Sequence, residues 1–583
     1  MKKALLALLL FLCLALPLFA NSQRYYAVSS NEWQLVNWLC HYAGVAGPTS
    51  NGPVQQAQLE LALQRAENVL GQDNAVAQYL RERFSRTSSL YTDTLGEVGL
   101  TGILYPQVYV QTNKPYGEDL ETKPVFAIDQ DWFVMSQKDR STANITLENT
   151  LGDFFYARMS LDYKQKLSAE IENSNFHTSL YGGTIHQNVP LDAGLSLGTK
   201  GFSFITGRGK VSLGEGYTGN TAIGDNYEYQ EFMKFGFYTK RTAVALTLTS
   251  FDSGRSNEER EITWPWQLQS SRFSGYRELR HSVTYEMLPV DNFKASLSFI
   301  TLIDTNTVFD FRYLNPFMVM HNYFNYHDPI EEWSTLEANN MISVDFSWSV
   351  AKKWNVYVQL TMDQFQLGEA EGYESAFEYT DPNAFGGLLN VSYSDYVADG
   401  VLTLYAETVY NMPGMYLNSK YYYEDNLVTQ KKTNKRCWSQ DYLMGYFRTE
   451  SDYDDVAYSA YKYGPDCFVV SLGGGYQKIS GYEVSFSALY MVHGEKGRGD
   501  AVENYTFDGI DDLESVNRVA LTGTLERTLA LTLTGSYEIL PWLTLSAGAA
   551  YSYRWNYRNS EGAEFGNLQA YLGFGIAKSS YKL

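Results

Sequence analysis

Polar and apolar residues alternate with a period of two over much of the chain beyond residue 140. In the segment 155–164 the apolar positions are Phe155, Ala157, Met159, Leu161 and Tyr163, and the positions between them are Tyr156, Arg158, Ser160, Asp162 and Lys164. The same alternation recurs in 342–350, 354–362, 482–490 and 543–553. Successive side chains of a β-strand point to opposite faces, so each segment predicts a strand with one apolar and one polar face.

Short and long connections alternate between these predicted strands. The short turns are 239–241, 288–292, 351–353, 394–400, 478–482 and 538–542, and the long polar segments lie near 252–275, 303–338, 364–384, 411–465 and 493–517. About thirteen strands follow residue 230, and the segments 141–151, 154–165, 175–184, 191–198 and 202–210 add about five. We therefore predict an all-β transmembrane barrel of roughly 18 antiparallel strands over residues 96–583, with apolar faces toward lipid and polar faces toward a wet lumen.

Residues 21–95 follow a different period. The apolar positions Leu59, Leu61, Ala62, Ala66, Val69 and Leu70 form a stripe at helical spacing, and Gly71 follows as a stop signal. We predict a small N-terminal helical unit of two or three helices over 21–95. An even number of strands returns both chain ends to the same side, so we expect these helices and the C-terminus in the periplasm.

The first twenty residues differ again. Lys2 and Lys3 precede an apolar run from Leu5 to Leu16, and the small residue Ala20 ends it. This order of a positive region, a short apolar region and a small residue predicts a signal peptide over 1–20. The location expected for the mature chain is therefore the cell outer membrane.

Composition agrees with a barrel and excludes one class of partner. Aromatic residues make up 15% of the chain, and 47 residues are tyrosine, which is typical of barrels with aromatic girdles at both membrane interfaces. The formal net charge is −21, so nucleic acid is not expected as a partner. Beyond the signal peptide the cysteines are Cys40, Cys437 and Cys467; their odd number excludes complete pairing, and a Cys437–Cys467 bond stays open.

Residues 214–220, GEGYTGN, match the glycine spacing of a dinucleotide-binding turn. That turn works only between a strand and a helix, and no helical pattern follows here. Two other interpretations remain, a structural turn in or above the lumen and a ligand contact through Tyr217 and Asn220. Arg208 and Lys210 alternate on one predicted strand, so both can face the lumen, where they bind an anionic sugar or pair with acidic residues.

The run 207–226, GRGKVSLGEGYTGNTAIGDN, resembles a motif of the Wzi-type capsule-assembly family of outer-membrane β-barrels, in a divergent, spirochaete-like form. The matching residues are Arg208, Lys210, Ser212, Gly214, Gly216, Gly219, Asn220, Asp225 and Asn226, while Leu213 stands where the family has tryptophan. The stretches 312–324, 339–346 and 354–365 resemble further blocks of that family. The resemblance implies a barrel that associates with or organises surface polysaccharide, with outer-membrane lipid and surface polysaccharide as partners and a monomeric state.

The long segment 411–465 adds candidate sugar-binding residues. Tyr421, Tyr422, Tyr423 and Trp438 can stack on the apolar faces of sugar rings, or pack within their own loop. The full set of candidate ligand-binding residues is Arg208, Lys210, Tyr217, Asn220, Tyr421, Tyr422, Tyr423 and Trp438. A general porin that passes small solutes and a surface adhesin remain as alternatives.

No catalytic constellation is found in the sequence. G-x-S-x-G occurs only within a predicted strand, at 194–198, where it cannot form the strand-to-helix turn of a nucleophile elbow, and H-E-x-x-H does not occur. We therefore expect no enzyme activity and no cofactor. His321 and His327 lack the further ligands of a metal site, and no metal is expected there. Asn315 and Pro316 predict a turn around which Phe317, Met318 and Met320 pack.

Overall fold

The computed structural model describes a large part of the chain. The described residues are 23–85, 91–92, 96–113, 140–164, 176–178, 192–227, 229–252, 277–305, 311–317, 337–364, 384–426, 431–440, 443–447, 453–478, 481–496, 505–506 and 519–579.

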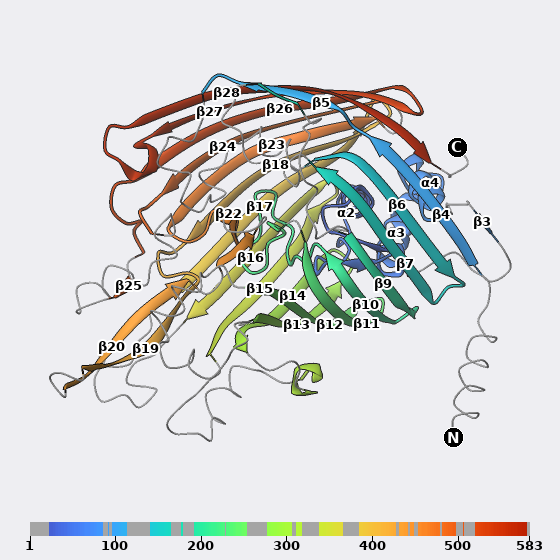
Figure 1. The fold of residues 1–583 in the computed structure, drawn as a ribbon. Coiled ribbons are helices and arrows are strands. Elements are labelled where there is room, and N and C mark those ends of the chain that lie inside the picture. The colour runs from blue at the N-terminus through green and yellow to red at the C-terminus, as the bar shows by residue number, and fades with distance from the viewer. Residues whose placement is uncertain are drawn as a thin grey trace, which may run out of the picture.

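A closed barrel of 18 antiparallel strands forms most of the molecule (Figure 1). Its first wall strand is β4 (Gly96–Leu104), which continues as β5 (Gln107–Gln111). The other wall strands are β6 (Ser141–Leu151), β7 (Phe155–Lys164), β9 (Asp192–Thr199), β10 (Phe202–Gly209), β11 (Gln230–Tyr238), β12 (Thr242–Asp252), β13 (Arg277–Val290), β14 (Phe293–Thr305), β15 (Glu337–Ala351), β16 (Trp354–Gln364), β17 (Ala384–Val397), β18 (Gly400–Asn411), β23 (Cys467–Lys478), β24 (Tyr482–His493), β26 (Glu526–Leu540), β27 (Leu543–Trp555) and β28 (Glu564–Ser579). β28 pairs with both β4 and β5 and so closes the barrel.

The predicted barrel is confirmed, but one predicted wall strand is replaced by another. The sequence predicted a strand near 175–184, where the described backbone holds only β8 (Phe176–Thr178), paired with β5. The wall instead includes β4 and β5, which were not predicted as strands. Pro106 lacks the N–H that a strand interior requires and separates the two. β5 has only five residues, and glycines at positions 96, 99 and 102 interrupt the alternation of β4.

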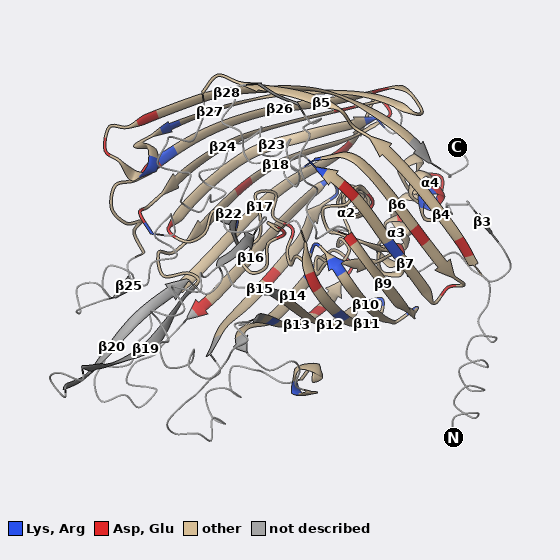
Figure 2. Ribbon diagram, viewed as in Figure 1, with Lys and Arg blue, Asp and Glu red and all other residues tan. Residues whose placement is uncertain are grey.

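The two faces of the wall have the polarity expected in lipid. On β15, Ser343, Asp345 and Ser347 point into the barrel and are buried, whereas Phe346 is 36% and Trp348 48% exposed on the outside. In water the buried face of a sheet is the apolar one. The reversed pattern is that of a barrel that spans a membrane, and few charged positions interrupt the wall strands (Figure 2).

The two ends of the barrel differ. One end carries the short connections, such as those between β11 and β12 and between β15 and β16, and we call it the short-turn end. At the other, long-loop end the hairpin of β19 and β20 projects away from the wall (Figure 1). The additional strands are β19 (Leu417–Asn426), β20 (Lys431–Gln440) and β25 (Tyr505–Thr506) in one sheet, β21 (Leu443–Phe447) and β22 (Tyr453–Tyr458) in a second, β1 (Tyr25–Tyr26) and β2 (Val54–Gln55) in a third, and β3 (Tyr91–Thr92) beside β4.

Three helices lie in the bore near the short-turn end (Figure 1). They are α2 (Asn31–Ala43), α3 (Gln56–Leu70) and α4 (Ala75–Ser85). Ser30 caps α2 by accepting from the Trp33 amide, and Gly44 ends it with a φ of 77°. Trp38 Nε1 donates to the Leu402 carbonyl at 2.9 Å, which ties α2 to the barrel wall.

The predicted N-terminal helices are thus confirmed. Within the described residues, no helix is both long and apolar enough to cross a membrane.

Candidate functional site

The segment 210–227, which we call the inward loop, fills part of the bore between β10 and β11. The Leu213 amide donates to the Ile223 carbonyl at 3.0 Å and closes the neck of the loop. Leu213 and Ile223 are buried in one apolar cluster with wall residues such as Ile300 and Leu388. Apolar side chains that would otherwise face a wet lumen are therefore covered by the loop.

Glu407 on β18 holds the tip of the inward loop. Its carboxylate accepts from the amides of Tyr217 and Thr218, each at 2.7 Å, and from the Thr218 hydroxyl at 2.5 Å. Asn390 on β17 donates to the same carboxylate at 3.1 Å. Hydrogen bonds to a carboxylate are stronger than bonds between neutral groups, so Glu407 fixes this tip within the bore.

Gln359 on β16 holds the other side of the inward loop. Its Oε1 accepts from the Thr221 amide at 2.7 Å, and its Nε2 donates to the Leu213 carbonyl at 3.1 Å. The Tyr416 hydroxyl donates to the Thr221 carbonyl at 2.9 Å. The loop backbone is thus paired with side chains that project from the wall and from the segment after β18.

The glycines of GEGYTGN serve this fold of the loop. Gly214 has a φ of 130°, and the Gly216 amide donates to Asn220 Oδ1 at 3.0 Å. A Cβ at Gly214 would lie 2.7 Å from Asn220 Cγ and 2.9 Å from Gln359 Nε2. The glycines are needed for close packing inside the bore, and the nucleotide interpretation is not needed to explain them.

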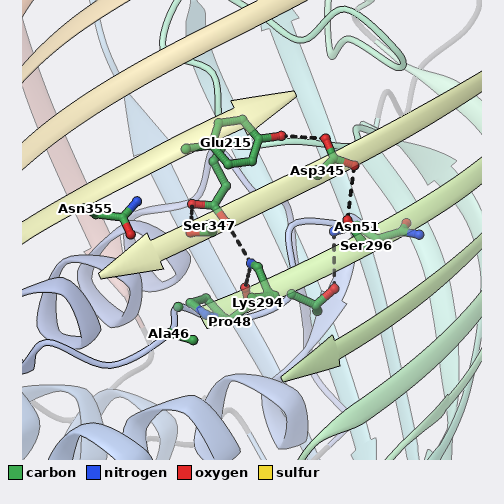
Figure 3. A network of polar contacts seen from close by, with 12 residues as sticks. Ala46, Pro48, Asn51, Glu215, Lys294, Ser296, Asp345, Ser347 and Asn355 are labelled. Carbon is green, nitrogen blue, oxygen red and sulfur yellow. Dashed lines mark hydrogen bonds and ion pairs between the residues drawn. The ribbon is translucent and has the colours of Figure 1, made fainter. Parts of the chain in front are cut away.

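A buried ion pair joins the inward loop to the barrel wall, and its lysine also binds the N-terminal segment (Figure 3). Lys294 Nζ on β14 lies 2.6 Å from Glu215 Oε1, and each side chain is 4% exposed. The same ammonium donates to the Pro48 carbonyl at 2.5 Å, and Ser347 donates to Glu215 at 3.3 Å. Glu215 therefore has both a charge partner and a hydroxyl donor, as a buried carboxylate requires.

A second lysine binds the same N-terminal segment. Lys234 on β11 is buried, and its ammonium donates to the carbonyls of Asn51 and, at 2.9 Å, Pro53. The Gly52 amide in turn donates to the Ser212 carbonyl at 2.9 Å. The barrel, the inward loop and the chain that precedes α3 are therefore bonded to one another directly.

A further loop, residues 458–466, packs against the inward loop. Asn226 Nδ2 donates to the carbonyls of Tyr458 and Ala460 at 2.8 and 2.7 Å. Tyr461 and Tyr463 are buried in the same apolar cluster as Leu213. Together the two loops and the helices fill part of the bore of the described barrel.

The candidate residues of the inward loop are placed in different surroundings. The Tyr217 ring stacks on Tyr405 with centroids 3.9 Å apart and an angle of 4° between the planes, and 46% of Tyr217 remains exposed. Asn220 is buried and accepts within the loop. Lys210 lies just beyond β10, and its ammonium donates to the Asp225 carbonyl at 3.3 Å. Tyr217 is the one of these three that offers a free aromatic surface.

Arg208 does not share the lumen with Lys210. On β10 the buried residues Ser203 and Ile205 face inward, so Arg208 lies on the outward face. Its Nε donates to Glu231, its cross-strand partner, at 2.7 Å. The expectation that both basic residues face the lumen is wrong for Arg208, because Arg208 alternates with the inward-facing positions of β10. Lys210 does not share its face because β10 ends at Gly209.

The four aromatic candidates of the long segment lie far along the chain from the inward loop, on β19 and β20. Tyr421 pairs with Arg436 and Tyr422 with Lys435 in the backbone register. The side chains of Tyr421, Tyr422, Tyr423 and Trp438 lie outside the described residues. The sequence candidates therefore divide between the bore and the projecting hairpin instead of forming a single site.

Sequence reasoning missed the wall residues that hold the inward loop. Glu407, Gln359, Lys234 and Lys294 all occupy inward positions of predicted strands. The available signal was a charged residue within an otherwise neutral polar face, as with Glu407 in the segment LTLYAETVY. That signal marks a buried partner but does not say which loop provides it.

A cavity of about 580 Å³ remains in the bore beside the helices and the inward loop. It runs from Glu32 and Arg83 on the helices along β6 and β7 to Lys164 and Asp192 at the other end of the wall strands. Ion pairs line it: Arg24 with Glu148 at 3.7 Å and Arg158 with Asp192 at 3.3 Å. The cavity is polar and contains both signs of charge.

Cys467 is a free, buried thiol. Its Sγ–H contacts the Gly464 carbonyl at 3.4 Å. The Cys437–Cys467 bond that the sequence left open is therefore not formed. Within the described ranges, no group of three or more His, Cys, Asp or Glu residues is placed to hold a metal ion.

Comparison with known proteins gives a fold but no family. No protein-family model and no curated protein matches the chain. Among solved structures, Wzi of Escherichia coli, described as an outer membrane protein involved in group 1 capsule assembly and as a carbohydrate-binding β-barrel, is similar over 96% of this chain and 99% of its own, with a TM-score of 0.52 and 11% identity. The chain has the fold of an outer-membrane β-barrel.

Two further solved structures, one of them described as an outer membrane channel, are more distant from this barrel. DcaP of Acinetobacter baumannii matches 84% of this chain and all of its own at 8% identity, with a TM-score of 0.36. OccK8 of Pseudomonas aeruginosa matches 83% of this chain and 98% of its own, with the same identity and TM-score.

Proposed function

We propose that this chain is a non-enzymatic outer-membrane protein that associates with or organises surface polysaccharide. The observation that carries the proposal is the occlusion of the bore by helices and inward loops. A barrel filled in this way presents its long loops as its main binding surface. The likeness to a barrel described as carbohydrate-binding supports the same class of ligand, and in this proposal the helices and the C-terminus lie in the periplasm.

The projecting hairpin favours an acidic polysaccharide. β20 carries Lys431, Lys432, Lys435 and Arg436 in a chain whose net charge is −21. β19 brings Tyr421, Tyr422 and Tyr423 opposite the middle of that strand, residues 434–436. Basic groups bind anionic substituents and tyrosines stack on sugar rings, so the hairpin combines both kinds of contact.

Binding of purified full-length protein to immobilised glycans tests this proposal. We expect acidic polysaccharide from the source cell surface to bind, and at least a tenfold loss of affinity when the four basic residues of β20 are changed to glutamine. Changing Arg527 and Arg558 to glutamine, away from the hairpin, is the control. Absence of binding to every surface polysaccharide of the source would overturn the proposal.

The cavity beside the helices and the inward loop supports a second function, passage of small polar solutes. Its lining reaches from the helices to the ends of β7 and β9 at the long-loop end. It is therefore the route that a channel would use. Planar-bilayer recordings would then show a steady small conductance. Asn144→Trp, at a residue that lines this cavity, would reduce that conductance, whereas Ser552→Trp on β27, which does not line it, would not. An electrically silent wild-type protein would exclude the channel.

A further inference from the structure

A short segment of the chain, residues 311–317, lies against the outside of the barrel. It begins with the 3₁₀ turn η3 (Phe311–Leu314), which appears as a short coil outside β12 and β13 (Figure 1). Tyr313 is 5% exposed and packs in a cluster with Leu246, Val283 and Ile303. The rings of Tyr313 and His281 lie 6.4 Å apart.

These wall residues are on the outward face. The positions beside them in sequence, Thr247, Ser282 and Leu302, point inward, and Leu302 belongs to the apolar cluster of the bore. Elsewhere the outward residues are exposed, as Met287 is at 52%. Val283, in contrast, is 2% exposed, because the segment 311–317 covers it.

Polar outward residues mark the height of the segment on the wall. His281, Thr301 and Asn340 are cross-strand neighbours on β13, β14 and β15. Asn340 lies eight residues from Trp348 on β15, about 26 Å at ~3.3 Å per residue. With a tilt of about 40° this is roughly 20 Å in height, close to the ~25 Å apolar band of such barrels. The segment therefore lies at the edge of the lipid-facing band that is nearer the long-loop end.

Backbone groups of the segment are hydrogen-bonded, as contact with lipid requires. The Asn315 amide donates to the Arg312 carbonyl at 3.1 Å, and Asn315 Oδ1 accepts from the Phe317 amide at 3.1 Å. Tyr285 on β13 donates its hydroxyl to the Pro316 carbonyl at 2.5 Å, and proline has no N–H to satisfy. Unpaired backbone groups are not tolerated beside lipid, and these groups have partners.

Two phenylalanines of the segment point away from the wall. Phe311 is 83% and Phe317 78% exposed, the largest values among the exposed large hydrophobic residues of the described chain. The prediction that Phe317 packs around the Asn315–Pro316 turn is therefore wrong, and Met318 and Met320 lie outside the described residues. We propose that the segment 311–317 is an interfacial anchor that binds membrane lipid at the long-loop end of the barrel through Phe311 and Phe317. Aromatic residues favour this interface, and the proposal needs only that the barrel spans a membrane.

Lipid contact of Phe317 is measured by fluorescence quenching. A Phe317→Cys protein in a Cys437→Ser background, in which Cys40 and Cys467 are buried, is labelled with an environment-sensitive maleimide. It is reconstituted in vesicles that contain phospholipid with a nitroxide on the acyl chain. We expect quenching at least half as strong as at Leu531→Cys, an outward position on β26 that is 43% exposed.

A water-exposed position and a second label complete the test. Glu561→Cys, in the turn between β27 and β28, is expected to show little quenching by the lipid probe and strong quenching by iodide. Phe311→Cys is expected to behave as Phe317→Cys does, and it keeps the test valid if one variant fails to fold. If both labels respond as Glu561→Cys does, the segment faces water and the proposal is overturned. Glycan binding has no influence on this result.

Discussion

At the scale of single residues, the inside of the barrel depends on charged groups with several partners each. Glu407 is the clearest case, because its carboxylate accepts from two amides and one hydroxyl of the inward loop. A buried donor that loses its partner costs about 1–3 kcal/mol. The stability of the loop is therefore concentrated in a few wall side chains.

Replacing Glu407 with alanine tests this dependence. Three loop donors, on Tyr217 and Thr218, would lose their acceptor, so we expect the free energy of unfolding to fall by about 3 kcal/mol. Guanidinium unfolding of the reconstituted barrel, followed by tryptophan fluorescence, measures the change. Glu483→Ala, at an exposed position near the short-turn end, should change it by less than about 0.5 kcal/mol. Equal effects at the two sites would refute the role of Glu407.

Asp466 makes the contacts of its loop depend on pH. It is buried and accepts from the amides of Lys496 and Thr522, each at 3.0 Å. Burial raises the pKa of Asp466 to about 6, although these hydrogen bonds act in the opposite direction. A folded-state pKa above the unfolded value means that the stabilisation is complete below about pH 4 and is lost as the pH rises through 6.

Hydrogen exchange can detect this loss. Between pH 4 and 7, protection factors at the Lys496 and Thr522 amides, corrected for intrinsic exchange, should fall by up to roughly 100-fold, which corresponds to two pKa units. In Asp466→Asn the same amides should show no such trend. A rise in protection with pH in the wild type would contradict the raised pKa of Asp466.

At the scale of elements, the strands could be predicted and the inward loop could not. Alternation within ten residues decides which face of β15 or β27 is apolar, so that information is local. The inward loop depends on Gln359, Glu407 and Tyr461, which lie more than a hundred residues away in the sequence. The interrupted strand formed by β4 and β5 was missed for a local reason, since the glycines of β4 and Pro106 break its pattern.

The inward loop also explains which glycine substitution is harmful. Gly214 and Gly481 have similar φ values, 130° and 134°, but a Cβ at Gly481 would meet no atom within 4 Å. Gly481→Ala should therefore cost only backbone strain, about 1–3 kcal/mol. Gly214→Ala should cost clearly more, because its Cβ would overlap Asn220 and Gln359. Thermal midpoints of the two reconstituted variants measure the difference, and equal midpoints would mean that the loop moves aside easily.

At the scale of the whole molecule, the barrel, the inward loop and the helices are joined through the residues before α3. Lys294 contacts Glu215 and the Pro48 carbonyl at once. Lys294→Met would leave Glu215 buried without a charge partner, and we expect a loss of about 3–5 kcal/mol in the guanidinium unfolding free energy. The double variant with Glu215→Gln should recover most of it. A double variant no more stable than Lys294→Met would mean that the lysine acts through Pro48 alone.

The labelling rate of Cys40 on α2 shows whether the inward loop and the helices open together. Its thiol is completely buried, and burial raises its pKa to about 11, so a maleimide reacts with it only after the helices open. In a chain with Cys437→Ser and Cys467→Ala, Lys234→Met should accelerate labelling at least tenfold, because the carbonyls of Asn51 and Pro53 lose their donor. Lys200→Met, at an exposed turn, should leave the rate unchanged.

The decisive comparison is Glu407→Ala, since Glu407 contacts the inward loop and no helix. The loop is bonded to the N-terminal segment through Ser212 and Gly52, so an opening of loop and helices as one unit transmits the whole loss to Cys40. A loss of about 3 kcal/mol then appears as a labelling rate raised roughly 100-fold, at 1.4 kcal/mol for each factor of ten. If the loop opens by itself, labelling of Cys40 stays at the wild-type rate although the loop is destabilised. In that case the bore could be cleared from the long-loop end while the helices still close the short-turn end.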